Sequence, residues 1–158
     1  MRAYADTSFL VKLLTEEPGT AAAVADYRSL GRPAVFFLPL HELEVSNAIR
    51  QRAFHLRRSM RSSERASIAR ERDAALNLMK KYIARGAFIE STLDMDEALT
   101  LARALSEKHT DRLGCRGFDL LHVALALELE CDAFVTSDRV QGELARAEGL
   151  SVTVSAGE

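Results

Sequence analysis

The stretches "AYADTSF" (residues 3–9) and "AFVTSDR" (residues 133–139) each run from apolar residues straight into an acid. Asp6 ends the first run, and Asp138 follows Thr136 and Ser137 in the second. A short apolar run that stops at polar residues is typical of a buried strand and its end. In a parallel sheet the carboxyl ends of the strands share one edge, where ligands bind. If both strands point the same way, we expect Asp6 and Asp138 to lie at that edge.

The rest of the chain alternates between strand and helix patterns. We expect strands at 2–5, 34–38, 87–92, 133–136 and 150–154. We expect helices at 7–17, 20–30, 40–56, 62–84, 94–109, 119–130 and 139–149, with Ser62 or Ser63 capping the fourth and Asp94 the fifth. Such alternation predicts an α/β domain with a mainly parallel sheet. Residues 1–158 form a single domain in this interpretation, and a helical hairpin at about 40–84 projects from it.

Composition places the chain among ordinary globular proteins. Its 158 residues, with 47% apolar and 28% charged, suit one domain with a core of its own. No apolar stretch is long enough to span a membrane, and an acid follows the start too soon for a signal peptide. Cys115 and Cys131 lie far apart and form no metal-binding spacing, so we expect reduced thiols in a cytoplasmic protein.

The net charge of −2 hides a strong asymmetry. Residues 50–85 hold eleven basic and three acidic residues, whereas the remainder is acidic. A basic segment of this kind suits a polyanion such as RNA, but it suits an acidic protein partner equally well. Phe54 is the only aromatic residue between 50 and 72, so base stacking is not the expected mode of binding. The RNA- or partner-binding candidates are Arg50, Arg52, Arg57, Arg58 and Arg61.

Two further acids join the candidates. Asp119 opens the apolar helix "DLLHVALALELE", and Glu44 lies early in the helix that contains "LHELEVSNAIR". Four carboxylates that meet without matching bases repel one another, and a divalent cation relieves this repulsion. Paired Mg²⁺ ions activate water and stabilise the leaving oxygen in phosphodiester cleavage. The hydroxyls of Thr7, Ser8, Thr136 and Ser137 lie next to these acids in the sequence.

Each candidate also has a purely structural interpretation. Asp6 and Asp138 suit helix N-caps, and Asp119 suits a favourable interaction with a helix dipole. Glu44 suits a solvated helix surface, and Glu42 competes with it as the functional acid. His122, one turn after Asp119, is either a general acid or base or a packed, hydrogen-bonded histidine; on so apolar a helix we expect the packed role.

Taken together, "YADTSFLVKLL", "LHELEVSNAIR", "GFDLLHVALALELECDAFVTSDR" and "RAEGLSV" resemble the PIN-domain family, most of all the VapC-type toxins of toxin–antitoxin pairs. The resemblance implies a three-layer α/β/α fold and a metal-dependent ribonuclease that uses Mg²⁺ or Mn²⁺. It implies a homodimer that a small antitoxin protein silences. The acids that it implies as catalytic and metal-binding are Asp6, Glu44, Asp119 and Asp138, with Thr7, Ser8 and Thr136 as supporting hydroxyls and Asn47 orienting Glu44.

One departure from the family concerns the region 56–84, which is long and rich in arginine and leaves the geometry of antitoxin binding open. The alternative function is a catalytically silent PIN-like interaction module that receives a basic protein partner in its acidic pocket. A phosphoacceptor domain that uses a single Asp ranks last, because "AFVTSD" supplies no lysine after the late strand.

Overall fold

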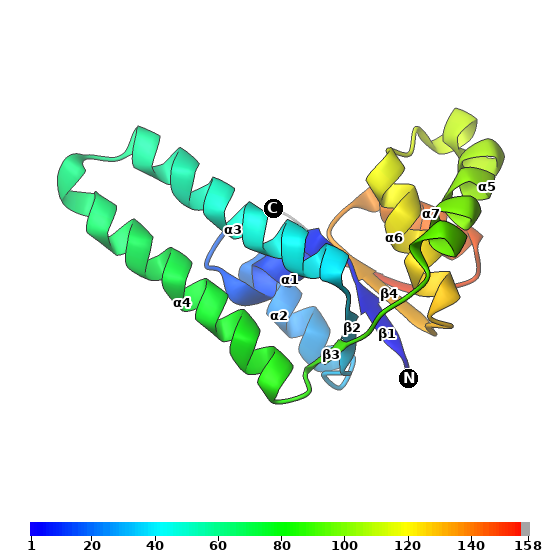
Figure 1. The fold of residues 1–158 in the computed structure, drawn as a ribbon, viewed down its shortest axis with the longest axis horizontal. Helices are drawn as coiled ribbons and strands as arrows, with labels where there is room; N and C mark the ends of the chain where they lie inside the picture. Colours follow the sequence, from blue (N-terminus) through cyan, green and yellow to red (C-terminus); the bar gives the residue numbers. More distant parts are fainter. Residues whose placement is uncertain (156–158) are drawn as a thin grey trace.

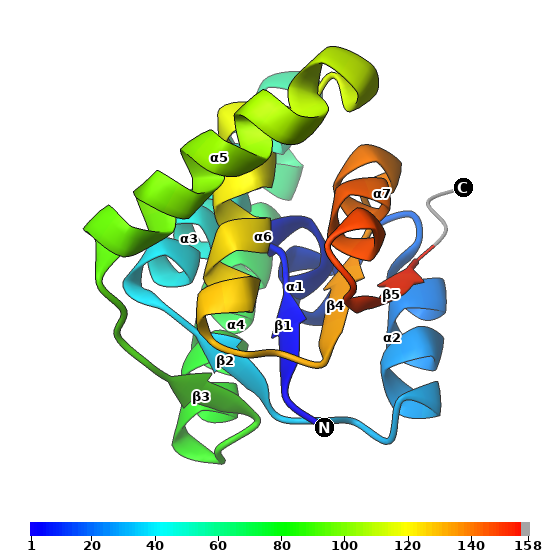
Figure 2. The same ribbon diagram turned by 90° about the vertical axis from the view of Figure 1, so that its right-hand side faces the viewer.

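A five-stranded sheet forms the centre of the computed structural model, which describes residues 1–155. The strand order is β3-β2-β1-β4-β5, and every neighbouring pair is parallel (Figure 2). The predicted sheet is confirmed, and it is wholly rather than mainly parallel. The strands are β1 (Ala3–Ala5), β2 (Val35–Phe37), β3 (Phe88–Glu90), β4 (Ala133–Thr136) and β5 (Ser151–Val154).

Helices cover both faces of this sheet, as the three-layer prediction requires. They are α1 (Thr7–Leu14), α2 (Thr20–Ser29), α3 (Pro39–Ser59), α4 (Arg65–Ala84), α5 (Met95–Leu113), α6 (Gly117–Glu128) and α7 (Arg139–Ala147). Asp94 caps α5 as predicted. The predicted cap at Ser62 or Ser63 is wrong, because both residues lie in a 3₁₀ turn between α3 and α4 in which Glu64 accepts the Arg61 N–H.

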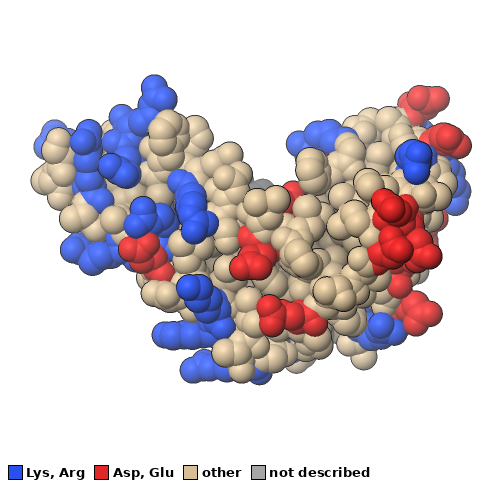
Figure 3. Space-filling view, viewed as in Figure 1, with Lys and Arg blue, Asp and Glu red and all other residues tan. Residues whose placement is uncertain are grey.

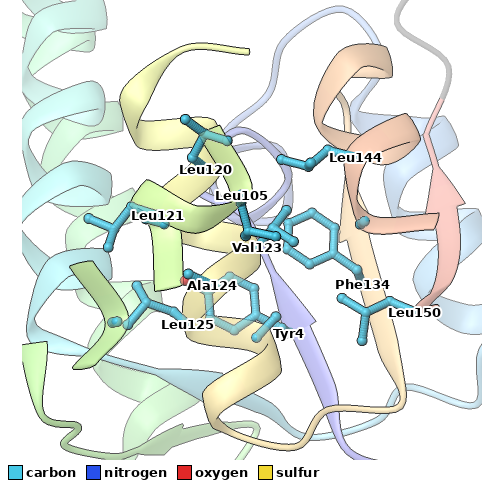
Figure 4. Packing of buried hydrophobic residues seen from close by; sticks show 14 of the residues in the cluster. Tyr4, Leu105, Leu120, Leu121, Val123, Ala124, Leu125, Phe134, Leu144 and Leu150 are labelled. Atoms are coloured by element: carbon cyan, nitrogen blue, oxygen red, sulfur yellow. The ribbon is translucent and has the colours of Figure 1, made fainter. Parts of the chain in front are cut away.

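The alternation of side chains along β1 divides the core between the two faces. Tyr4 packs with α5, α6 and α7 (Figure 4), whereas Ala3 and Ala5 face the layer built by α1 to α4. All three residues are fully buried. A strand that is buried on both faces belongs at the centre of a parallel sheet, and this position brings the end of β1 into the interior.

The hairpin of α3 and α4 projects from the sheet, as the sequence predicts (Figure 1). Its base is anchored by Val45, Ile49, Ala75 and Met79, all buried against the α1–α4 layer. The end of the hairpin is crowded with basic side chains, whereas acidic side chains gather at the opposite end of the molecule (Figure 3). The charge asymmetry of the sequence is therefore also an asymmetry in space.

Two expectations about the environment of the chain can be compared with the structure. Cys115 and Cys131 are buried free thiols. Within residues 1–155 no helix combines the length and the hydropathy that a membrane crossing requires.

Candidate active site

The pairing of β1 with β4 explains why both apolar runs end in an acid. The two strands are adjacent, parallel and in register from Ala3–Ala133 to Ala5–Val135. Asp6 directly follows β1, and its backbone N–H donates to the carbonyl of Val135 at 3.0 Å. Thr136, the last residue of β4, places its hydroxyl 2.9 Å from the Asp6 carboxylate. The strands thus deliver Asp6 and Asp138 to one edge of the sheet, as predicted.

Asp6 is the most enclosed of the four acids, with 4% of its surface exposed. Burial raises the pKa of its carboxyl group, and hydrogen bonds from the Phe9 N–H, the Ser8 hydroxyl and the Thr136 hydroxyl oppose that rise. The Phe9 contact makes Asp6 the N-cap of α1. The structural and the functional interpretations of Asp6 are therefore compatible, because the same carboxylate caps α1 and lies at the carboxyl edge of the sheet with the other candidates.

Glu44 reaches the same place from the second turn of α3. Its Oε2 atom accepts hydrogen bonds from the Thr7 hydroxyl at 2.7 Å and from Nε2 of His122 at 2.9 Å. Burial raises the pKa of Glu44, but the bonds from His122 and Thr7 outweigh it and lower the pKa overall. Glu44 is thus held as a carboxylate. Glu42 is exposed and lies away from this place, which decides between the two candidates in favour of Glu44.

Asp119 and Asp138 share one guanidinium. Arg116 donates from Nε to Asp119 at 3.1 Å and from Nη2 to Asp138 at 3.0 Å, although its side chain is 75% exposed. Asp119 also accepts the Arg116 backbone N–H at the start of α6, and Asp138 caps α7 through the Gln141 N–H. The expectation that the acids lack matching bases is therefore wrong for Asp119 and Asp138, because Arg116 pairs with both.

All four acids line one depression of about 330 Å³, which we call the acid hollow. They come from four separate segments: the ends of β1 and β4, the second turn of α3 and the first turn of α6. The hollow is completed by Thr7, Ser8, Arg116, Gly117, Phe118, His122 and Gln141. Within residues 1–155, no three His, Cys, Asp or Glu side chains are placed closely enough to hold a metal ion together.

Several predicted residues lie elsewhere. Asn47 is exposed on α3 and lines a different depression with Glu42 and Leu43, and no hydrogen bond within residues 1–155 joins it to Glu44. The prediction that Asn47 orients Glu44 therefore does not hold in this structure, where Thr7 and His122 do so. Arg52 turns toward the connection between α1 and α2, where it contacts the Glu16 carbonyl and the Glu17 carboxylate.

The other arginines of the hairpin form a second feature, which we call the arginine groove. This depression of about 710 Å³ between α3 and α4 is lined by five arginines: Arg50, Arg57, Arg58, Arg65 and Arg72. Arg61 is exposed but does not line it. The sequence therefore predicted three of the five groove arginines, and the facing helix α4 supplies the two that it missed.

Three hydrogen-bonding side chains of the acid hollow, those of Arg116, His122 and Gln141, were not among the predicted site residues. Arg116 precedes Asp119 by three positions, a spacing that places the two side chains on one face of a helix and could have suggested the pair. His122 is packed and hydrogen-bonded as expected, but its contact with Glu44 joins residues 78 positions apart. The side-chain oxygen of Gln141 is a second acceptor for the Thr136 hydroxyl, which can donate its single hydrogen either to Gln141 or to Asp6. No local signal in the sequence marks Gln141.

Comparison with known families agrees with this geometry. The PIN domain family matches residues 3–147. The chain belongs to the PIN domain family. PIN domains are usually nucleases, and those nucleases commonly use divalent metal ions. No curated protein matches this PIN domain at a significant level.

Proposed function

We propose that this PIN domain is a metal-dependent endoribonuclease and the toxin of a type II toxin–antitoxin pair. The observation that carries the nuclease proposal is the convergence of Asp6, Glu44, Asp119 and Asp138 on one hollow from four separate segments. Three local helix-end interactions and one solvated helix acid would not by themselves bring these carboxylates together. In this proposal the four acids are both the catalytic and the metal-binding residues, and residues 1–158 act as a single domain.

The donor chemistry of the acid hollow fits Mg²⁺ or Mn²⁺, which prefer carboxylate oxygens. An ion between Asp119 and Asp138 would take the place of the Arg116 guanidinium, whose high exposure leaves it free to swing into solvent. Such an ion, when bound, supplies an activated water and neutralises charge on the scissile phosphate. Glu44 would contribute its free oxygen Oε1, since both of its hydrogen bonds go to Oε2.

The remaining groups of the hollow hold the acids in place. Ser8 and Thr136 fix the two oxygens of Asp6, and Thr7 fixes Glu44. The Thr136 hydroxyl also accepts the Asp138 N–H at 2.9 Å, so one side chain ties both strand ends together. Preorganised carboxylates of this kind avoid the cost of reordering when a cation or a phosphate arrives.

The arginine groove is the proposed contact for the RNA backbone. Four of its arginines have no acidic partner within residues 1–155, whereas Arg72 is paired with Asp73 at 2.8 Å. The Phe54 ring is 55% exposed at the groove with the Arg58 guanidinium over it, so one base can stack there. Concave shape, positive charge and an exposed ring together favour single-stranded RNA over an acidic protein at this place.

The toxin assignment adds two partners to the proposal, a small antitoxin and a second copy of the chain. An apolar groove of about 430 Å³ between α1, α3 and α4 offers the antitoxin a docking surface. Its walls include Leu13, Leu56, Ile68 and Leu78, with Arg52 and Glu71 at the margin. An amphipathic segment suits such a groove. The proposal includes a cytoplasmic location, where such a toxin would meet its RNA target.

One observation favours the alternative of a silent interaction module. Asp119 and Asp138 already bind a guanidinium, and an arginine from a basic partner could bind them in the same way. The two functions differ in their response to metal. A nuclease gains stability from Mg²⁺ or Mn²⁺, because a ligand that binds only the folded state stabilises it, whereas a silent module does not.

The test is cleavage of total RNA by the purified protein, with Mg²⁺, with Mn²⁺ and with a chelator, beside Asp6→Asn prepared identically. We expect discrete fragments that require metal and that disappear in the variant. The fragment ends identify the target as transfer, ribosomal or messenger RNA. No cleavage by protein shown to be free of antitoxin, together with no stabilisation by metal, would refute the nuclease and favour the silent module.

A further inference from the structure

A buried chain of hydrogen bonds connects the hydrophobic core to the acid hollow. The Tyr4 hydroxyl lies 2.8 Å from Nδ1 of His122, and Nε2 of the same ring lies 2.9 Å from Oε2 of Glu44. Tyr4 is 0% exposed and His122 is 4% exposed. The chain therefore runs from the central strand, through α6, to the carboxylate on α3.

The chemistry of the three groups determines where the hydrogens lie. A carboxylate only accepts hydrogen bonds, so Nε2 of His122 carries a hydrogen and donates it to Glu44. In the neutral ring Nδ1 is then an acceptor, and the Tyr4 hydroxyl donates to it. A ring protonated on both nitrogens would leave the Tyr4 hydrogen without an acceptor, because His122 is the only hydrogen-bond partner of that hydroxyl within residues 1–155. Burial raises the pKa of Tyr4 well above its ordinary value, so the phenol keeps its hydrogen.

Packing also fixes the orientation of the His122 ring. His41 stacks on it with 5.4 Å between the ring centroids, and Tyr4 packs against its edge at 5.8 Å. Nδ1 of His41 accepts the Leu38 N–H at 3.0 Å. Burial, followed by the influence of His122, lowers the pKa of His41 to about 3, so the stacked ring is neutral. His122 therefore lies between aromatic rings from β1 and α3 and has no freedom to turn its Nε2–H away from Glu44.

We infer that His122 is a positioning residue for Glu44 and that Glu44 and Tyr4, one at each ring nitrogen, together fix the tautomer in which His122 can do this. Together with Thr7, His122 takes up Oε2 of Glu44 and leaves Oε1 without a hydrogen-bond partner within residues 1–155. The consequence for catalysis rests on the proposed function, whereas the selection of the tautomer does not. Groups that orient a metal-binding side chain in this way typically change metal affinity or activity by about 10–100-fold when they are replaced.

Two substitutions of His122 separate positioning from packing. In His122→Gln, the longer amide places an N–H near the position of Nε2 and keeps the donor to Glu44. In His122→Asn, the shorter amide reaches only as far as Nδ1 and loses that donor. We expect Mn²⁺ binding, measured by titration calorimetry without RNA, to weaken by about 10–100-fold in the Asn variant and to stay near the wild-type value in the Gln variant. Cleavage of RNA should follow the same order.

The chain offers a matched control in His109, which is buried on α5 and hydrogen-bonded to Glu148 outside the acid hollow. His109→Asn breaks a similar pair, so it should lower the melting temperature while leaving Mn²⁺ binding unchanged. The same loss of Mn²⁺ binding in His122→Gln and His122→Asn, or a loss that merely follows the melting temperature in all three variants, would overturn the inference in favour of packing alone.

A spectroscopic test separates this inference from the proposed function. The nitrogen chemical shifts of His122, measured by NMR on the metal-free protein, should show hydrogen on Nε2 and none on Nδ1. Tyr4→Phe should leave the hydrogen on Nε2, because Glu44 still accepts it, but should shift the Nδ1 signal, because nothing then donates to that nitrogen. A hydrogen on Nδ1 in the wild type overturns the inference even if the protein cleaves RNA. If the expected tautomer is seen and no Mn²⁺ binds, the nuclease proposal fails while the orientation of Glu44 by His122 stands.

Discussion

The arginine groove makes a quantitative prediction about the binding of RNA. Binding to single strands weakens with salt, with a slope of log affinity against log salt of about −0.7 for each phosphate contacted. Arg50, Arg57, Arg58 and Arg65 line the groove without an acidic partner within residues 1–155, so up to four contacts are available. The slope should then be about −2.8, and affinity should fall by about 50-fold between 50 and 200 mM salt.

Replacing two groove arginines should halve this dependence. In Arg57→Gln/Arg58→Gln we expect a slope of about −1.4 and a loss of only about sevenfold over the same range. The assay is fluorescence anisotropy of a labelled 20-nucleotide RNA, with a chelator present so that no cleavage occurs. Both side chains are exposed, so the fold should not change.

The matched control is Lys80→Gln/Lys81→Gln, which removes the same charge from exposed positions on α4 outside the groove. If this control lowers the slope as much as the groove variant does, net charge rather than the groove binds RNA. An unchanged slope in the groove variant would refute the assignment of the groove outright, and an acidic protein partner would become the better candidate for it.

Three further predictions concern the acid hollow and the packing beneath it. Asp6→Asn should raise the metal-free melting temperature at pH 7, because burial disfavours the charged carboxylate. This gain should shrink as the pH falls through the raised pKa of Asp6, where the wild type becomes protonated, and thermal unfolding across pH checks both points. Arg116→Gln should tighten Mn²⁺ binding in calorimetry, since a cation no longer has to displace a guanidinium; weaker binding would contradict that competition. Gly142→Ala should destabilise the protein, because the added methyl group would lie 2.6 Å from Val154 Cγ2. The clash should cost about 1–3 kcal/mol, and the better helix propensity of alanine should return about 1 kcal/mol of it. A gain in stability on chemical denaturation would exclude the clash.

The fold was predictable because each strand and helix carries a local pattern. "AFVT" is a strand over its full predicted length, and the other elements differ from prediction mainly by a few residues at their ends. Both strand-end acids were also predictable, since parallel strands share a carboxyl edge. The sequence suggested repulsion among the four acids, whereas in the structure burial of the carboxylate is what raises the pKa of Asp6.

The partners of the acids were harder to predict because they depend on long-range contacts. His122 meets Glu44 across 78 positions, and which arginines face the groove depends on the rotation of two long helices. Arg52 and Arg57 lie in the same basic run, yet they project to different sides of the hairpin. Charge counts along a sequence therefore indicate a basic segment but do not assign its side chains to a surface.

The position of β1 between β2 and β4 has a consequence for the timing of synthesis. The first of the five strands is the central one, yet one of its two neighbours, β4, comes about 130 residues later, as does the Thr136 hydroxyl that holds Asp6. Chain elongation proceeds at about 5–20 residues per second, so several seconds separate Asp6 from its partners. A nascent chain on the ribosome therefore has no assembled acid hollow until β4 and Asp138 have been made. A cell that makes an RNA-cleaving protein would be protected by the order of the strands during that interval.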